Sequence, residues 1–176
     1  VIQSTDEQSK ETKSSSIEIQ GVNLYVGQNK IVYNAENHYY SGNVNWTIKN
    51  DNEEICKAEL LEEKPYEDED LKRYNIRFNT MKEGETYITV NDGYEDVWKY
   101  HVVIKKAPED MVLFNDTKVE NTFLSDCDKN KDGYVSKNEI KTVTRMYLDY
   151  SGIRDLTGLE YAENLQYISL NNNKYL

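Results

Sequence analysis

The sequence predicts a mainly β fold, an antiparallel β-sandwich, followed by a small α+β part. Short runs rich in Val, Ile, Tyr and Thr recur about every ten residues across 16–107, with Gly, Asn and Asp between them. After Pro108 the apolar residues take up helical spacing. The final segment, 143–176, aligns with itself at a constant offset, which is typical of a repeat.

Composition narrows the class of protein. The chain has 176 residues and a formal net charge of -11, which fits one large domain or two small ones. Acidic surfaces disfavour nucleic acid as a partner, because phosphates are bound by Lys and Arg, but they suit cations. No apolar run is long enough to span a membrane. Residues 1–15 are polar and predict a disordered tail or stalk, and the initial Val suggests a processed or cloned fragment.

The segment 16–107 is expected to form the sandwich. Its first strand is predicted from apolar residues at nearly alternate positions, namely Ile17, Ile19, Val22, Leu24 and Val26. A later run places Val44, Trp46 and Ile48 on one face. Turn signals occur at Gly42-Asn43, Glu83-Gly84 and Asp92-Gly93. No helical run between the strands is long enough for a crossover, so we expect antiparallel pairing.

The runs LYVGQ, VNWTIKN, KEGETYITVNDGY and YHVVI resemble a bacterial immunoglobulin-like domain. That resemblance implies that Trp46 lies in a central strand and that Gly84 lies in the turn before the penultimate strand. The charged segment EEKPYEDEDLKRY is interpreted as an insertion or long loop. Cys56 and Cys127 are interpreted as buried or half-buried thiols, because two cysteines do not make a disulfide framework.

Residues 108–142 are expected to form a linker and a calcium-binding cap. The linker APEDMVLFND should dock through its apolar residues Met111, Val112, Leu113 and Phe114. Val119 and Phe123 are spaced i, i+4 behind a possible cap at Asn115 or Asp116, which predicts one short helix.

The run DKNKDGYVSKNE fits the calcium loop of EF-hand type. The predicted oxygen ligands are Asp128, Asn130, Asp132, the carbonyl of Tyr134, Ser136 and Glu139. Gly133 stands where the backbone must turn, and Ca²⁺ suits this oxygen shell better than Mg²⁺. The alternative is a polar turn in which Glu139 only completes a capping box with Ser136. Dockerin modules carry similar loops in duplicate, but this sequence has one loop, which favours a structural staple over a calcium sensor.

The segment 143–176 repeats at the spacing of Val143 to Leu165, and the same offset aligns Met146 with Ile168. Its pattern resembles the leucine-rich repeat, with Asn173 as the turn asparagine and Ser151 in its place one repeat earlier. From about 115 onward the chain resembles the start of an internalin-type repeat region, in which an EF-hand-like helical cap precedes the first repeat. A helix over 137–142 should cover the apolar edge of that repeat. Internalins, however, place their immunoglobulin-like domain after the repeats. With about one and a half repeats, we expect a longer protein or a second chain at the open end.

No catalytic constellation is evident, so no enzyme is predicted. His38 and His101 lie beside no nucleophile motif, and the acidic clusters (Glu53-Glu54, Glu62-Glu63 and 67–70) are interpreted as solvated loop charge. The first hypothesis is a secreted or cell-surface bacterial binding or adhesion protein with calcium as its cofactor. Its concave partner-binding face would present Arg145, Tyr147, Asp149, Tyr167, Ser169 and Asn171 to a protein or host-surface ligand. The alternatives are a non-catalytic accessory module of an extracellular carbohydrate-active enzyme and, third, a calcium switch.

Overall fold

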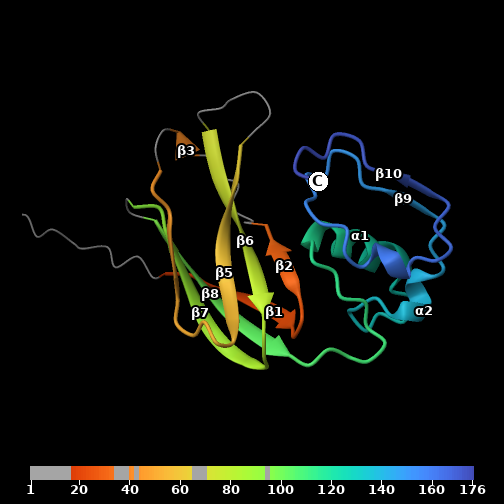
Figure 1. Ribbon diagram of the computed structural model, residues 1–176, viewed down its shortest axis with the longest axis horizontal. Coiled ribbons are helices and arrows are strands. Elements are labelled where there is room, and N and C mark those ends of the chain that lie inside the picture. The colour runs from red at the N-terminus through yellow and green to blue at the C-terminus, as the bar shows by residue number, and fades with distance from the viewer. Residues whose placement is uncertain (1–16, 34–39, 42–43, 65–70, 94–95) are drawn as a thin grey trace, which may run out of the picture.

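The structure is a computed structural model that describes residues 17–33, 40–41, 44–64, 71–93 and 96–176. A β-rich part and a smaller part with helices lie side by side (Figure 1). The predicted tail 1–15, His38, the Gly42-Asn43 turn and the acidic run 67–70 lie outside the described residues. No helix in the described ranges is both long and apolar enough to cross a membrane.

The first part is built of strands that form two sheets. Its strands are β1 (Ile19–Tyr25), β2 (Asn29–Val32), β3 (Tyr40–Ser41), β4 (Thr47–Asn50), β5 (Cys56–Glu63), β6 (Leu71–Thr80), β7 (Gly84–Asn91) and β8 (Val97–Lys105). One sheet has the order β1-β8-β7-β4. The other has the order β2-β6-β3, with β5 also paired to β6.

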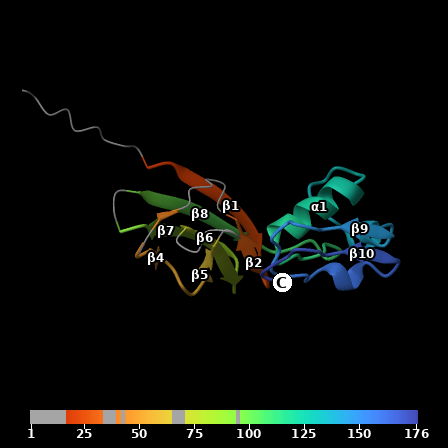
Figure 2. The same ribbon diagram turned by 90° about the horizontal axis from the view of Figure 1, so that it is seen from above.

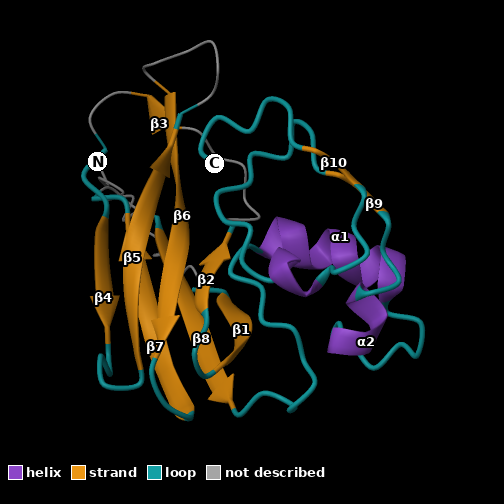
Figure 3. Cartoon of the chain, turned by 45° about the vertical axis from the view of Figure 1, so that its right-hand side comes forward, coloured by secondary structure: helices purple, strands orange, loops and turns teal. Residues whose placement is uncertain are grey.

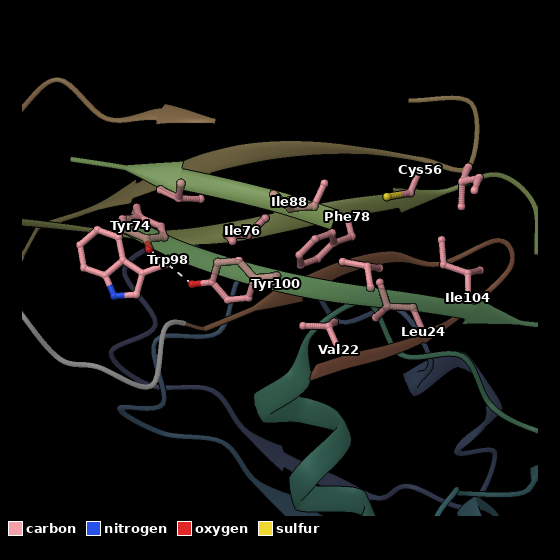
Figure 4. Close-up of a cluster of buried hydrophobic side chains, with 13 residues drawn as sticks. Val22, Leu24, Cys56, Tyr74, Ile76, Phe78, Ile88, Trp98, Tyr100 and Ile104 are labelled. Atoms are coloured by element: carbon pink, nitrogen blue, oxygen red, sulfur yellow. Dashed lines mark hydrogen bonds between the residues drawn. The ribbon is translucent and has the colours of Figure 1, made fainter. Parts of the chain in front are cut away.

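The two sheets pack face to face over one apolar core (Figure 4). Alternate residues of β8 point inward, among them Trp98, Tyr100 and Val102, and meet Tyr74, Ile76 and Phe78 of β6. The period of two along each strand places one set of side chains in the core and leaves the other set in solvent. The predicted mainly β layered fold is therefore confirmed.

The pairing is not wholly antiparallel. β1 runs parallel to β8, with Val22 opposite Val102. The chain leaves β1 through a turn at Gly27, whose φ is +93°, and crosses to β2 in the other sheet. The prediction of antiparallel pairing considered only helical crossovers. Here the chain passes through the other sheet, so β1 and β8 can lie parallel without a crossover helix between them.

The first strand also differs from prediction in its buried residues. Ile17 and Ile19 are 51 % and 52 % exposed, whereas Val22 and Leu24 are buried. Side chains alternate along a strand, so residues 19 and 22 cannot share a face. Of the apolar residues predicted to line one face of this strand, only those from Val22 onward face the core.

Three further expectations for the sandwich need correction. Trp46 precedes β4, which is an edge strand and not a central one. Part of the predicted insertion belongs to β5 and β6. Glu63, expected to be solvated, is buried and accepts hydrogen bonds from Arg73 (2.7 Å) and Asn75 (2.6 Å).

The expected position of Gly84 agrees with the structure. Gly84 is the first residue of β7, the strand before β8, as the resemblance implied.

The second part contains α1 (Thr117–Cys127), α2 (Lys137–Ile140), β9 (Arg145–Tyr147), the 3-10 turn η1 (Leu159–Tyr161) and β10 (Tyr167–Ser169). Its helices and its two short strands form a separate group beside the sandwich (Figure 3). The N-cap of α1 is Asp116, whose Oδ1 accepts from the backbone of Lys118. Met111, Val112 and Phe114 of the linker are buried, as predicted, and α2 ends two residues before the predicted boundary.

Both cysteines are buried and free of a disulfide, as predicted. Burial raises the pKa of both thiols, that of Cys127 to about 11. Each thiol therefore remains protonated at neutral pH and behaves as a small apolar side chain.

The sandwich and the second part are joined through β2. The end of the linker lies along this strand, with a parallel bridge between Ile31 and Asp116. The Thr117 hydroxyl donates to the carbonyl of Ile31 at 2.6 Å. Lys30, buried at this junction, forms an ion pair with Glu120 at 2.6 Å. Backbone pairing and the ion pair of the buried Lys30 fix the two parts relative to each other, so the sandwich is not a freely hinged spacer.

Candidate functional site

The predicted calcium loop follows α1 and is held by hydrogen bonds to its own backbone. Asp128 accepts from the amides of Lys131 (2.8 Å) and Gly133 (3.2 Å). Asn130 Oδ1 accepts from the amide of Asp132 at 2.9 Å. Gly133 has φ +89°, a backbone conformation that glycine adopts without strain. These side chains therefore shape the turn, and their oxygens lie along its exposed side.

Glu139 ties the two ends of the loop together. One carboxylate oxygen accepts from the amide of Lys129 (3.1 Å), and the other accepts from the amide (3.0 Å) and hydroxyl (2.8 Å) of Ser136. Ser136 Oγ in turn accepts from the amide of Glu139, which completes the capping box of α2. The amide of Ser136 is the main cause of the lowered pKa of Glu139. The alternative of a capping box is thus present in the structure.

The donor set of the loop suits a hard cation. Asp128, Asp132 and Glu139 supply carboxylates, and each carboxylate has more lone pairs than its hydrogen bonds here use. Within the described residues, however, no three His, Cys, Asp or Glu side chains are gathered closely enough to hold a metal ion. The residues therefore fit the chemistry of Ca²⁺, while the carboxylates face backbone amides instead of a common centre.

A short backbone pairing anchors the far side of the loop. The amide of Val112 donates to the carbonyl of Val135 at 2.8 Å, and Met111 forms an antiparallel bridge with Ser136. Both valines are buried, so Val135 points into the core as predicted. The amide of Lys137 donates to the carbonyl of Asp110 at 2.7 Å. The linker thus pairs with the end of the predicted calcium loop.

The predicted register of the repeat is present. β9 and β10 pair in parallel, with Arg145 opposite Tyr167 and Met146 opposite Ile168. Asn173 joins the two turns of chain, since its Nδ2 donates to the carbonyls of Leu148 (2.7 Å) and Leu170 (2.9 Å). The Oδ1 atom of Asn173 accepts from the amide of Ile153, which follows β9 in the first repeat, at 3.2 Å. The offset of the repeat aligns Tyr175 with Ile153, which is buried in the core. Tyr175 instead reaches the sandwich, where its hydroxyl hydrogen-bonds the backbone of Lys64.

The outward face of these strands carries an exposed aromatic pair. Tyr147 and Tyr167 are 60 % and 47 % exposed, and their ring centroids lie 5.5 Å apart at an interplanar angle of 48°. Arg145, opposite Tyr167, is exposed as well. This part of the predicted binding face is therefore gathered on one surface and available for contact.

The other half of the predicted face has an internal role. Asp149 accepts hydrogen bonds from the hydroxyl of Ser169 (2.7 and 2.8 Å) and the amide of Asn171 (2.6 Å). The hydrogen bond from the Ser169 hydroxyl is the main reason that the pKa of Asp149 is lowered. Ser169 is buried. These three residues lock the ends of the two strands and so hold the tyrosines in place.

Sequence reasoning did not identify two features of this surface. Tyr150, three residues after Tyr147, is 78 % exposed and has φ +54°, a backbone conformation that non-glycine residues seldom adopt. The junction was also missed, although Asp116 serves both as the cap of α1 and as the acceptor for Tyr33 (2.6 Å) and the amide of Arg154 (2.8 Å). Only the capping role has a local sequence signal.

His101 lies on β8, as predicted, and its ring stacks on Tyr87 with centroids 4.8 Å apart. Its Nε2 is 2.8 Å from Glu85 Oε2, which is exposed. These residues lie on the outer face of the sandwich, on β7 and β8, away from the loop and the tyrosine pair.

No protein-family model and no curated protein matches this chain. Among solved structures, domains 4 and 5 of the S-layer protein SbsC match with 20 % identity and a TM-score of 0.36, covering 50 % of this chain and 42 % of that one. The solution structure of amebosin matches with 14 % identity and a TM-score of 0.33, covering 48 % and 88 %. The cysteine protease inhibitor EhICP2 from Entamoeba histolytica matches with 17 % identity and a TM-score of 0.30, covering 51 % and 95 %. The chain thus spans less than half the length of the SbsC fragment, and at these values the matches assign it to no family.

Proposed function

We propose that this chain is a non-catalytic binding module of a secreted or cell-surface protein. Its second part would be the start of a leucine-rich repeat region, and its first part an immunoglobulin-like base. The observation that carries the proposal is the tyrosine pair, Tyr147 and Tyr167, held on two parallel strands at the predicted repeat spacing. Aromatic side chains left in solvent on a rigid surface are characteristic of binding sites.

Protein is the ligand class that this face favours. The two rings are inclined at 48°, so they form a wedge and not a flat platform. A wedge suits an inserted side chain, whereas the face of a sugar ring stacks best on a flat surface. Arg145 beside the rings adds a planar donor for carboxylates or carbonyl groups.

An array of extracellular proteins and an array of glycans, both probed with the 176-residue chain, would test this proposal. We expect protein signals that are lost in a Tyr147→Ser/Tyr167→Ser variant and retained in a Tyr87→Ser variant, the control on the sandwich. Glycan signals that depend on the pair would favour the accessory module of a carbohydrate-active enzyme. Signals that do not respond to either tyrosine would refute the assignment of this face.

The proposed cofactor is Ca²⁺, with a structural role. Asp128, Asn130 and Asp132 would supply oxygen at the start of the loop, followed by the carbonyl of Tyr134, then Ser136 and Glu139. The ion would draw the carboxylates of the loop together, neutralise their charge and stabilise the start of α2. A weak site of this kind would stay filled outside cells, where calcium is about millimolar. That argument favours a secreted or cell-surface location.

Glu139→Gln separates the calcium site from the capping box. Glutamine can replace glutamate in a capping box but lacks the charge that calcium needs. We expect the variant to melt slightly below the calcium-free wild type, because glutamine lacks the charge that the hydrogen bonds of Glu139 stabilise, and to lose the increase that calcium gives. Ser136→Ala, the matched variant, should lower the melting temperature even without calcium. A wild type whose melting temperature and calorimetric titration do not respond to calcium would refute the metal site, and a shape change on binding would support a switch instead of a staple.

A further inference from the structure

β1 has one open edge. In the part of the chain that the structure describes, its one strand neighbour is β8. The amide of Val26 donates to the carbonyl of Lys105 at the end of β8. Backbone groups alternate in direction along a strand, so residues 19, 21 and 23 turn their N–H and C=O groups away from β8. β1 runs along the rim of the sandwich (Figure 2).

This edge lacks the features that usually prevent strands from pairing between molecules. β1 contains no charged residue and no proline. By contrast, β5 contains Lys57, Glu59, Glu62 and Glu63. The opposite edge strand of the same sheet, β4, is shorter and contains Lys49. Charge, proline and short length are the common protections of edge strands, and β1 has none of them.

Gly21, in the middle of this edge, is not explained by any contact among the residues that the structure describes. Its φ is not among the positive values that favour glycine. A Cβ at this position would meet no atom within 4 Å. Glycine weakens a strand, and its presence there often marks a place where another backbone approaches closely. Nothing in the described residues requires this glycine, and its position suits the approach of a backbone from another molecule.

We propose that β1 is a self-association edge at which two copies of this chain pair in antiparallel orientation around Gly21. A two-fold contact would place Ile19 of one copy opposite Asn23 of the other, with the two glycines facing each other. A chain of net charge -11 repels itself, so copies meet most easily where the edge carries no charge. The half-exposed Ile17 and Ile19 would then be covered by the second copy.

Sedimentation velocity over a range of concentrations tests this contact in the 176-residue chain. We expect a monomer–dimer equilibrium that tightens with added salt, because salt screens the repulsion between acidic copies. Asn23→Pro removes an N–H on the open side and leaves the ladder to β8 intact. Asn23→Lys adds a charge to the edge. Both variants should weaken dimerisation at least tenfold.

Thr47→Lys, an equal change in charge on the opposite edge strand, is the matched control and should leave the dimer unchanged. Circular dichroism and the melting temperature at low protein concentration show that each variant folds. A dimer that persists in folded Asn23→Pro would place the contact elsewhere and overturn the proposal. A monomer at all concentrations would also overturn it, and a dimer only after deletion of residues 1–16 would instead identify those residues as the occupant of the edge.

Discussion

Replacing Asp116 by alanine is expected to lower the free energy of unfolding by about 4 kcal/mol. The carboxylate is fully buried and accepts from three groups: the Tyr33 hydroxyl (2.6 Å), the amide of Arg154 (2.8 Å) and the amide of Lys118 (2.9 Å). Loss of a helix cap costs about 1 kcal/mol. The amide of Arg154, left without an acceptor, costs about 1–3 kcal/mol. The Tyr33 hydroxyl, which would keep only its longer contact to the carbonyl of Gly152 (3.2 Å), adds about 1 kcal/mol.

Guanidinium denaturation, followed by circular dichroism in the presence of a chelator, measures this loss. Tyr33→Phe removes one of the three donors and should cost about 1 kcal/mol, with little further loss when combined with Asp116→Ala. Asp126→Ala removes the same charge from an exposed position on α1 and should change stability by less than about 0.5 kcal/mol. A loss below about 1 kcal/mol for Asp116→Ala would mean that water replaces the carboxylate and that the junction is not as closely packed as described.

Three other perturbations test the second part. Gly158 has φ +105°, and a Cβ there would lie 2.5 Å from the ring of Phe114, so Gly158→Ala should cost about 3 kcal/mol in thermal unfolding. Asn173→Ala removes three hydrogen bonds between the two turns of chain, described above, and should cost about 2 kcal/mol and speed hydrogen exchange at the end of the chain. The amide of Ser136 is the main cause of the lowered pKa of Glu139, whose ordinary value is 4.5. A carboxyl group with a lowered folded-state pKa stabilises the fold above its ordinary pKa and loses that contribution as the pH falls through the folded value. Melting temperatures should therefore fall on acidification below about pH 4.5, and by less in Glu139→Gln.

Local patterns predicted the parts of the structure that depend on local chemistry. The loop glycine, the capping box of Ser136 with Glu139 and the helix cap at Asp116 all follow from residues within a few positions of one another. The register between β9 and β10 was also predictable. Successive units of a repeat stack with equivalent residues side by side, so the sequence offset directly gives the paired residues. Asn173 in particular bonds between turns as its position in the repeat suggested.

Long-range features were not predictable in this way. Nothing near Glu63 in the sequence indicates that Arg73 and Asn75 will face it across a strand pair. The parallel pairing of β1 with β8 depends on which sheet the chain enters at Gly27, and one turn residue does not determine that choice. Similarly, the carboxylate of Asp149 has no local signal for its contact with Ser169 on the next turn of chain.

The predicted calcium loop and the junction are parts of one continuous segment. Residues 110–112 pair with the end of the loop, and residues 115–117 pair with β2 of the sandwich. Only a few residues separate the two pairings, and Phe114 between them is buried. An ion that ordered the loop would therefore also order the strand-like segment that joins the two parts. In this arrangement the loop would stabilise the orientation of the tyrosine face relative to the sandwich, and not only the short helix α2 that follows it.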